Sequence, residues 1–149
     1  MQDNKQTTPN IVLLRGGCLW LLMALLLAWC MIALSFDIPL FKFIFAGKFT
    51  RLLQAHIDFL LMTALILGLY AAKTPLPWHV CWAMVIGAFT NSSLFLLMAI
   101  FPILDNPELP PPFFFQVYLY ASLITTSYGF GKASVIVLMS TFKPKNHSY

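Results

Sequence analysis

Charged residues are scarce in this chain. Only 9% of its 149 residues are Asp, Glu, Lys or Arg, and 60% are apolar, whereas soluble proteins are about half apolar and a quarter charged. A surface of this composition suits lipid rather than water. The net charge of +4 comes from residues that flank the apolar runs. It therefore indicates membrane topology and headgroup attraction, and it does not indicate a nucleic-acid-binding surface.

Several catalytic motifs are also missing. The sequence has no glycine-rich phosphate loop, no Ser-His-Asp order and no pair of carboxylates on one helix face, so hydrolase and kinase functions lack support. Its three cysteines, Cys18, Cys30 and Cys81, lie in apolar segments without paired spacing. That pattern predicts neither a disulfide framework nor a zinc site, and we interpret the cysteines as packing residues.

Four apolar runs make up most of the chain, and each is about as long as the ~20 residues that a helix needs to cross a bilayer. The first run exceeds the 7 to 15 apolar residues typical of a signal peptide, so we expect it to be a retained helix. The sequence therefore predicts an all-α integral membrane four-helix bundle, forming one transmembrane domain and assembling as an oligomer. The expected spans are about 11–35, 50–72, 78–101 and 113–139.

The connections between these runs differ in kind. Segment 37–49 contains Pro39 and several phenylalanines, which is typical of an interfacial loop. The sequence Thr74-Pro75-Leu76-Pro77 predicts a tight turn, because proline removes a donor and disfavours helix in the residue before it. The last apolar run reaches Phe142, too long for the membrane, so it must tilt, kink at Gly129 and Gly131, or protrude; we expect protrusion.

Basic residues indicate the topology. With both termini inside, the inner side collects five of them and the outer loops carry three, which favours cytoplasmic termini in a bacterial inner membrane. The inner set is Lys5, Arg15, Lys73, Lys143 and Lys145, and the outer set is Lys42, Lys48 and Arg51.

The second run carries two ionisable side chains, His56 and Asp58. Such groups cost ~2.5 to 3.5 kcal/mol at the centre of a span, so a helix that keeps them usually faces a protein interior or a functional cavity. Two residues apart, they diverge by about 200° around the helix and cannot form one dyad. His56 is either an interfacial histidine bonded to a backbone carbonyl or a metal or haem ligand. Asp58 is either a first-turn acid that stabilises the helix dipole or a functional carboxylate.

Polar residues on the other runs are possible partners. Gln116 and Tyr120 fall near the level of His56 and Asp58, where they could accept or donate hydrogen bonds. The run Thr90-Asn91-Ser92-Ser93 lies at mid-membrane, where small polar residues usually join helices. Asn91 is the exception, because its amide must find both donors and acceptors and could orient a polar ligand. Lys132 lies near the opposite interface, too far away for an ion pair with Asp58.

The stretch Arg51-Leu-Leu-Gln-Ala-His56, followed by an apolar span, a short turn and Thr90-Asn91, resembles the styrene oxide isomerase family. The match covers about residues 51–102. The resemblance implies a trimer holding haem b between subunits, with His56 as the iron ligand and ferric iron as a Lewis acid. It also implies a redox-neutral opening of an aryl epoxide to an aldehyde.

Two positions depart from the family. The asparagine that the family has two turns after the ligand is Met62 here, and a third-span tyrosine is Phe95; neither replacement can hydrogen-bond an epoxide oxygen. The resemblance thus implies that haem binding is retained and that epoxide isomerisation requires a polar contact from Asp58, Tyr120 or Tyr128.

Three functions are compatible with the sequence. In the first, a haem-dependent isomerase, His56 binds iron, Met62 and Phe95 line an apolar pocket, and Asn91, Asp58 and Tyr120 serve catalysis on a small hydrophobic substrate arriving through the bilayer. The second is a non-enzymatic accessory or structural membrane subunit. The third is a small oligomeric transporter that uses Asp58 or His56 for proton coupling.

Overall fold

Residues 8–142, the part that the computed structural model describes, form helices joined by non-helical connections and contain no strand. Four of the helices are long and apolar enough to cross a membrane, which confirms the predicted all-α membrane fold. Their bounds lie within three residues of the expected runs. In chain order the elements are α1 (Thr8–Ser35), α2 (Pro39–Ile44), α3 (Phe49–Ala71), α4 (Trp78–Ile100), the 3-10 helix η1 (Pro102–Asp105) and α5 (Phe113–Thr141).

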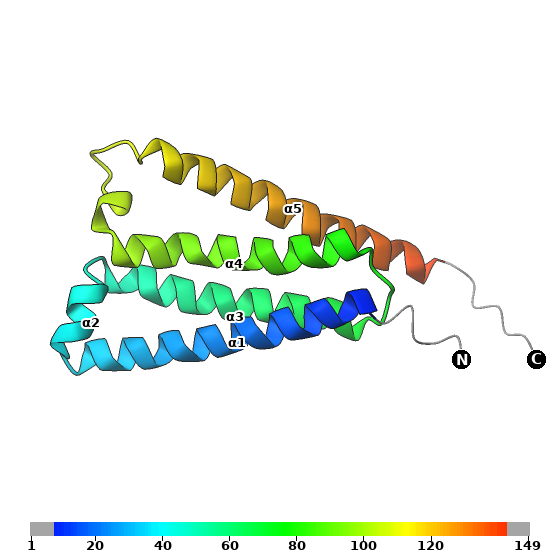
Figure 1. Cartoon of the computed structure of the whole chain (residues 1–149), viewed down its shortest axis with the longest axis horizontal. Helices are drawn as coiled ribbons and strands as arrows, with labels where there is room; N and C mark the ends of the chain where they lie inside the picture. Colours follow the sequence, from blue (N-terminus) through cyan, green and yellow to red (C-terminus); the bar gives the residue numbers. More distant parts are fainter. Residues whose placement is uncertain (1–7, 143–149) are drawn as a thin grey trace, which may run out of the picture.

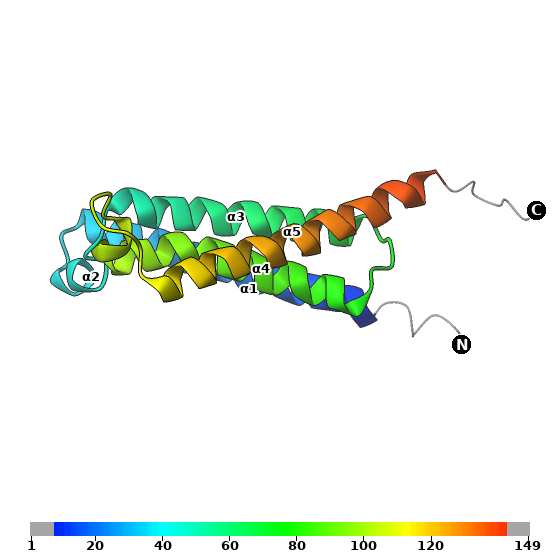
Figure 2. The same ribbon diagram turned by 90° about the horizontal axis from the view of Figure 1, so that it is seen from above.

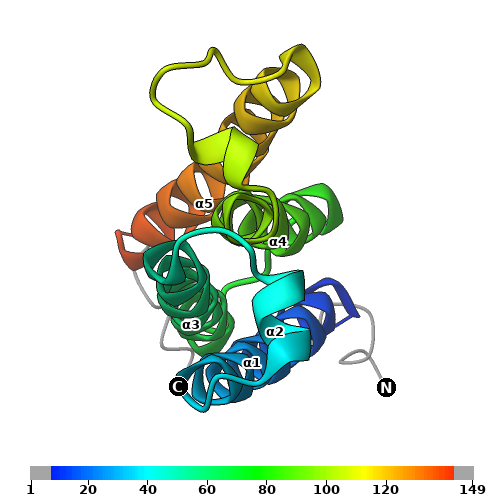
Figure 3. The ribbon, with the colours of Figure 1, turned by 90° about the vertical axis from the view of Figure 1, so that its left-hand side faces the viewer.

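The long helices run up and down, but they do not form a square bundle. Helices α1, α3 and α4 pack against one another, whereas α5 contacts α4 extensively and α3 only slightly. Figure 1 shows α5 starting apart from the other helices and slanting across α4, and Figure 2 shows the same crossing from above. In the end-on view of Figure 3, α5 lies on the opposite side of α4 from α1. The fold is therefore a three-helix unit with α5 attached through α4.

The connection after α1 contains more structure than the sequence predicted. The N–H of Ile38 donates to the carbonyl of Ala33 (3.2 Å) and that of Asp37 to Leu34 (3.0 Å). With Asp37 at φ 59°, this is the usual left-handed helix terminus, here without the common glycine. Pro39 then starts the short helix α2, because its fixed φ suits the first helical position. The expectation of a loop throughout segment 37–49 was wrong for these six residues.

Helices α4 and α5 approach closely at two glycines. A Cβ on Gly87 would lie 2.8 Å from Thr126 Cα, and a Cβ on Gly129 would lie 2.7 Å from the backbone nitrogen of Met84. The Thr126 hydroxyl donates to the Gly87 carbonyl across the same contact (2.9 Å). Helix α5 continues without a break through Gly129. Gly129 is therefore a packing position and not the flexible point that the sequence offered.

A charged cluster ties the loops together at the end of the bundle that carries α2. Asp105 accepts a hydrogen bond from Arg51 Nε (2.9 Å) and pairs with Lys48 Nζ (2.9 Å). The Arg51 and Lys48 donors lower the pKa of the Asp105 carboxyl to about 2. Beside them, the N–H of Gly47 donates to the Ala99 carbonyl (2.8 Å). The loop before α3 is thus fixed to the end of α4.

Aromatic side chains fill the centre of the three-helix unit. Trp20 of α1 stacks on Phe89 of α4 with ring centroids 4.8 Å apart, and Phe59 of α3 lies 6.1 Å from both rings. The indole N–H of Trp20 donates to the Val85 carbonyl (3.1 Å), so the polar atom of this large ring is satisfied inside the bundle. This contact fixes α1 against α3 and α4 close to the polar residues of α3.

Candidate functional site

The His56 side chain points toward α1. Its Nδ1 lies 2.9 Å from the backbone carbonyl oxygen of Ala24. Because a carbonyl oxygen can only accept, Nδ1 carries the hydrogen in the neutral ring and Nε2 carries the lone pair. The bond to a backbone carbonyl that the sequence analysis considered for His56 is therefore present. The same bond is also the usual one for a metal-binding histidine, whose second nitrogen is held by a carbonyl or a carboxylate.

Asp58 belongs to a different contact, on the flank of α3 that faces α4. Its Oδ2 accepts hydrogen bonds from Asn91 Nδ2 (2.9 Å) and from Ser92 Oγ (2.8 Å). Asp58 lies nine residues after Phe49, where α3 begins, so the interpretation as a first-turn acid was wrong. The side chains of Asp58 and Asn91 are only half-buried, which leaves this polar cluster accessible from outside the chain.

The two polar contacts thus lie on opposite flanks of α3. His56 contacts α1 and Asp58 contacts α4, and their positions differ by about 3 Å along the helix axis. The divergence agrees with the 200° expected from the sequence. Within one chain these residues do not share a ligand-binding surface.

The predicted pocket residues lie in different parts of the core. Met62 packs against the buried cluster that includes Met84, and Phe95 packs against the cluster that includes Phe59. Helices α3 and α4 are antiparallel. Met62, one turn after Asp58, and Phe95, one turn after Asn91, are therefore displaced in opposite directions along the bundle. Met62 and Phe95 therefore lie on either side of the Asp58–Asn91 contact and do not face each other.

The two α5 residues expected beside His56 and Asp58 lie elsewhere. Gln116 donates from Nε2 to the carbonyl of Pro111 (2.7 Å), and the Tyr120 side chain is 61% exposed. Tyr120 and Gln116 line a hollow of about 280 Å³ at the start of α5. The physical reason is the slant of α5, whose first turns stand away from α3 (Figure 1). Depth along the membrane could be estimated from sequence, but this tilt could not.

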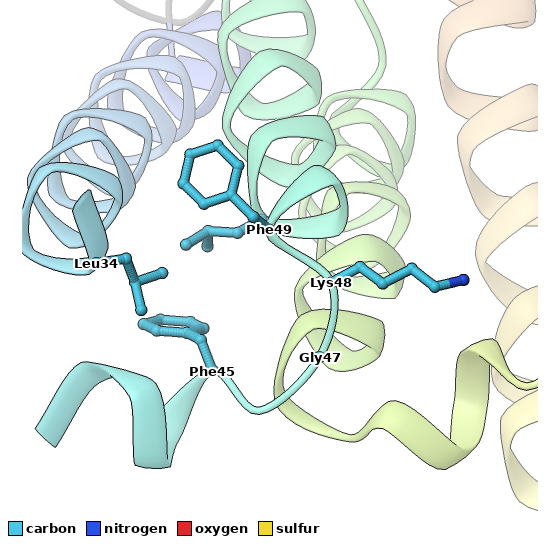
Figure 4. Close-up of a pocket in the computed structure, with 6 residues that line it drawn as sticks. Leu34, Phe45, Gly47, Lys48 and Phe49 are labelled. Atoms are coloured by element: carbon cyan, nitrogen blue, oxygen red, sulfur yellow. The ribbon is translucent and has the colours of Figure 1, made fainter. Parts of the chain in front are cut away.

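A second hollow, of about 190 Å³, lies under α2. It is lined mainly by apolar side chains, among them Leu34, Phe45 and Phe49. Figure 4 shows the ring of Phe45 beneath Leu34, and Lys48 directed away from the space between them. This arrangement places an apolar cavity at the end of the bundle, well separated along α3 from Asp58.

Sequence reasoning missed Ser92 as a partner of Asp58 and Ala24 as a partner of His56. Ser92 follows Asn91 directly, and adjacent helical residues can reach the same group from neighbouring directions, so a signal was present. The Ala24 carbonyl left no signal, because every helical residue has one.

Comparison with known proteins gives no family assignment. No protein-family model matches the chain, no curated protein matches it, and no solved structure matches it. The resemblance to styrene oxide isomerases therefore stays a prediction from the sequence.

Proposed function

We propose that this integral membrane protein binds haem b through His56 Nε2 and acts as an isomerase on a small apolar substrate taken from the bilayer. The observation that carries the proposal is the bond between His56 Nδ1 and the Ala24 carbonyl (2.9 Å). It fixes the ring and leaves Nε2 with the lone pair that a metal needs.

The surroundings of His56 fit such a group. Leu53 and Leu60 are three and four residues from His56, so they lie beside it on the helix surface; both are partly exposed. They offer an apolar surface for a flat macrocycle. Haem brings four nitrogen ligands of its own, so one histidine suffices on the protein side. Among residues 8–142 no three His, Cys, Asp or Glu side chains gather into a metal site, and a haem needs none.

The polar cluster supplies the second half of the proposed site. Asn91 carries two side-chain N–H donors, and one of them donates to Asp58 Oδ2. The second can bind a substrate oxygen, while Asp58, which also accepts from Ser92, fixes the amide. When bound, ferric haem would supply a Lewis acid that draws electrons from an epoxide oxygen. The resulting rearrangement to an aldehyde is redox-neutral and keeps all atoms of the substrate.

An oligomer brings the two halves together. His56 and Asp58 point to opposite flanks of α3, so one chain cannot place both against one ligand. Ring interfaces join unlike surfaces, so in a closed ring the α1 flank of one subunit would meet the α4 flank of the next. We propose a homotrimer of this kind, as the family resemblance implies. His56 of one subunit would then lie near Asn91 of its neighbour.

Charge favours an orientation in a bacterial inner membrane with both termini in the cytoplasm. At the end of the bundle that carries the α3–α4 turn, the described charges are the basic residues Arg15, Lys73 and Lys132; the other end carries Asp37, Asp105 and Glu108 beside its basic residues. Cytoplasmic loops are enriched in Lys and Arg. The other basic residues used in the topology prediction, Lys5, Lys143 and Lys145, lie outside the described residues.

The test is the visible absorption spectrum of the purified full-length protein expressed with ample haem. We expect a Soret band that is lost or strongly shifted in His56→Ala and unchanged in His79→Ala, a matched control on α4. Size analysis of the haem-loaded protein should give three chains. Absence of the band in the wild type, or its survival in His56→Ala, refutes the proposed ligand.

A second function, a non-catalytic accessory or structural subunit, is favoured by one observation. Asp58 and His56 both have hydrogen-bond partners within the chain, as they do in a bundle whose polar groups serve only packing. A haem-replete preparation that lacks a Soret band supports this function.

A further inference from the structure

Lys132, in the second half of α5, forms a cluster with residues of α4 and α5. Its Nζ donates to the hydroxyl of Tyr128 (3.2 Å) and lies 3.4 Å from Nε2 of His79. It also lies 5.3 Å from the centre of the Tyr128 ring, and that ring stacks on His79. The exposed ammonium group therefore has two hydrogen-bonding side chains, Tyr128 and His79, next to it.

No acidic residue of the described chain neutralises this charge. The acids among residues 8–142 are Asp37, Asp58, Asp105 and Glu108, and none of their ion pairs involves Lys132. An ammonium group has three N–H donors, and the Tyr128 and His79 contacts use two. One donor and the full positive charge remain for an anion.

The position of the cluster along the bundle matches the membrane boundary. His79 is the second residue of α4, so Lys132 lies level with the start of that span. Trp78 and Trp82 expose 68% and 48% of their surfaces nearby on α4, and Trp78 contacts His79 edge to face. Tryptophan and tyrosine concentrate at the level of lipid headgroups.

We propose that Lys132, His79 and Tyr128 bind the phosphate of an anionic phospholipid, with Trp78 and Trp82 against the adjoining glycerol and upper acyl chain. Lysine binds phosphate as a point charge, and the start of α4 adds the positive end of its helix dipole. The aromatic side chains favour a lipid over free phosphate, because they offer apolar surface next to the charge. This site is independent of the haem proposed at His56.

The experiment measures lipid retained by the full-length protein. The protein is extracted from phosphatidylcholine vesicles containing 10% phosphatidylglycerol, and bound lipids are counted by native mass spectrometry. We expect phosphatidylglycerol to be retained over phosphatidylcholine and K132Q to retain about fivefold less of it, since one lysine near a membrane surface contributes that much to anionic lipid binding. K132R keeps the charge and should retain most of the lipid. K42Q is the matched control, because Lys42 pairs with Asp37 at the other end.

Two results overturn the proposal. Equal retention by K132Q and the wild type excludes Lys132 as the anion-binding group. Displacement of the lipid by millimolar inorganic phosphate at constant ionic strength shows that the site takes free phosphate instead. If K132Q does not fold, a second measurement, made on the wild type and K132R, still tests the proposal. Solid-state NMR on wild type with ¹⁵N-labelled lysine should give a ³¹P–¹⁵N contact that disappears in K132R, and its absence in the wild type refutes the site.

Discussion

Gly129→Ala tests whether α5 is held by close backbone contact with α4. The new Cβ would lie 2.7 Å from the backbone nitrogen of Met84 and 2.8 Å from the carbonyl carbon of Ala83. Ordinary contact distances are about 3.5 Å or more. The helices must therefore separate by roughly 0.8 Å at this point, because a neighbouring helix backbone cannot rotate away as a side chain can.

The expected loss combines two opposing effects. Forcing one extra methyl group into a packed contact costs about 1 to 3 kcal/mol, and a gap of 0.5 to 1 Å removes a quarter to a half of the dispersion attraction. Alanine favours helix over glycine by about 1 kcal/mol. We therefore expect Gly129→Ala to lower the free energy of unfolding by about 1 to 2 kcal/mol.

Gly131 provides the matched control on the same helix. A Cβ at Gly131 meets no atom within 4 Å, so Gly131→Ala keeps only the gain in helix propensity and should stabilise by up to about 1 kcal/mol. Unfolding in SDS, followed by circular dichroism at matched detergent composition, measures both variants. Opposite signs two residues apart are the expected outcome. A Gly129→Ala protein as stable as Gly131→Ala would show that α5 is not packed on α4 as described.

Further predictions concern the polar contacts. Because the pKa of Asp105 is lowered to about 2, its ionised form stabilises the fold above about pH 4, and acid titration should reduce the unfolding free energy progressively toward pH 2; Asp105→Asn should remove most of this acid dependence. Asp58→Ala should cost about 1 to 3 kcal/mol in SDS unfolding because two donors lose their acceptor, whereas Asp58→Asn keeps an oxygen there and should cost less. Trp20→Phe should cost about 1 kcal/mol by leaving the Val85 carbonyl without the indole N–H; no change would contradict that bond.

The sequence was sufficient to predict the long helices. Their limits follow from local signals, since Pro77 and Pro112 directly precede α4 and α5 and proline at these positions fits a helix start. Helix α2 was missed because six residues with Lys42 among phenylalanines do not differ clearly from an interfacial loop.

The polar site could be predicted only in part. The divergence of His56 and Asp58 follows from helical geometry alone, and Asn91 could be identified from the cost of burying an amide. The choice of partners depends on how the helices cross. Asp58 binds α4 residues rather than Tyr120 because α5 slants away from α3, and a single sequence carries no local signal for that tilt.

The attachment of α5 mainly through α4 has a consequence for biosynthesis. Helices α1, α3 and α4 share a buried core, and the charged cluster around Asp105 joins their loops. This unit can therefore assemble in the membrane before the ribosome has completed α5. The exposed loop with Pro110, Pro111 and Pro112 is then a natural point at which to divide the chain into two polypeptides. Co-expression of the two fragments should restore the whole protein, because the α4 surface at Gly87 and Met84, against which α5 packs, is formed before α5 is synthesised.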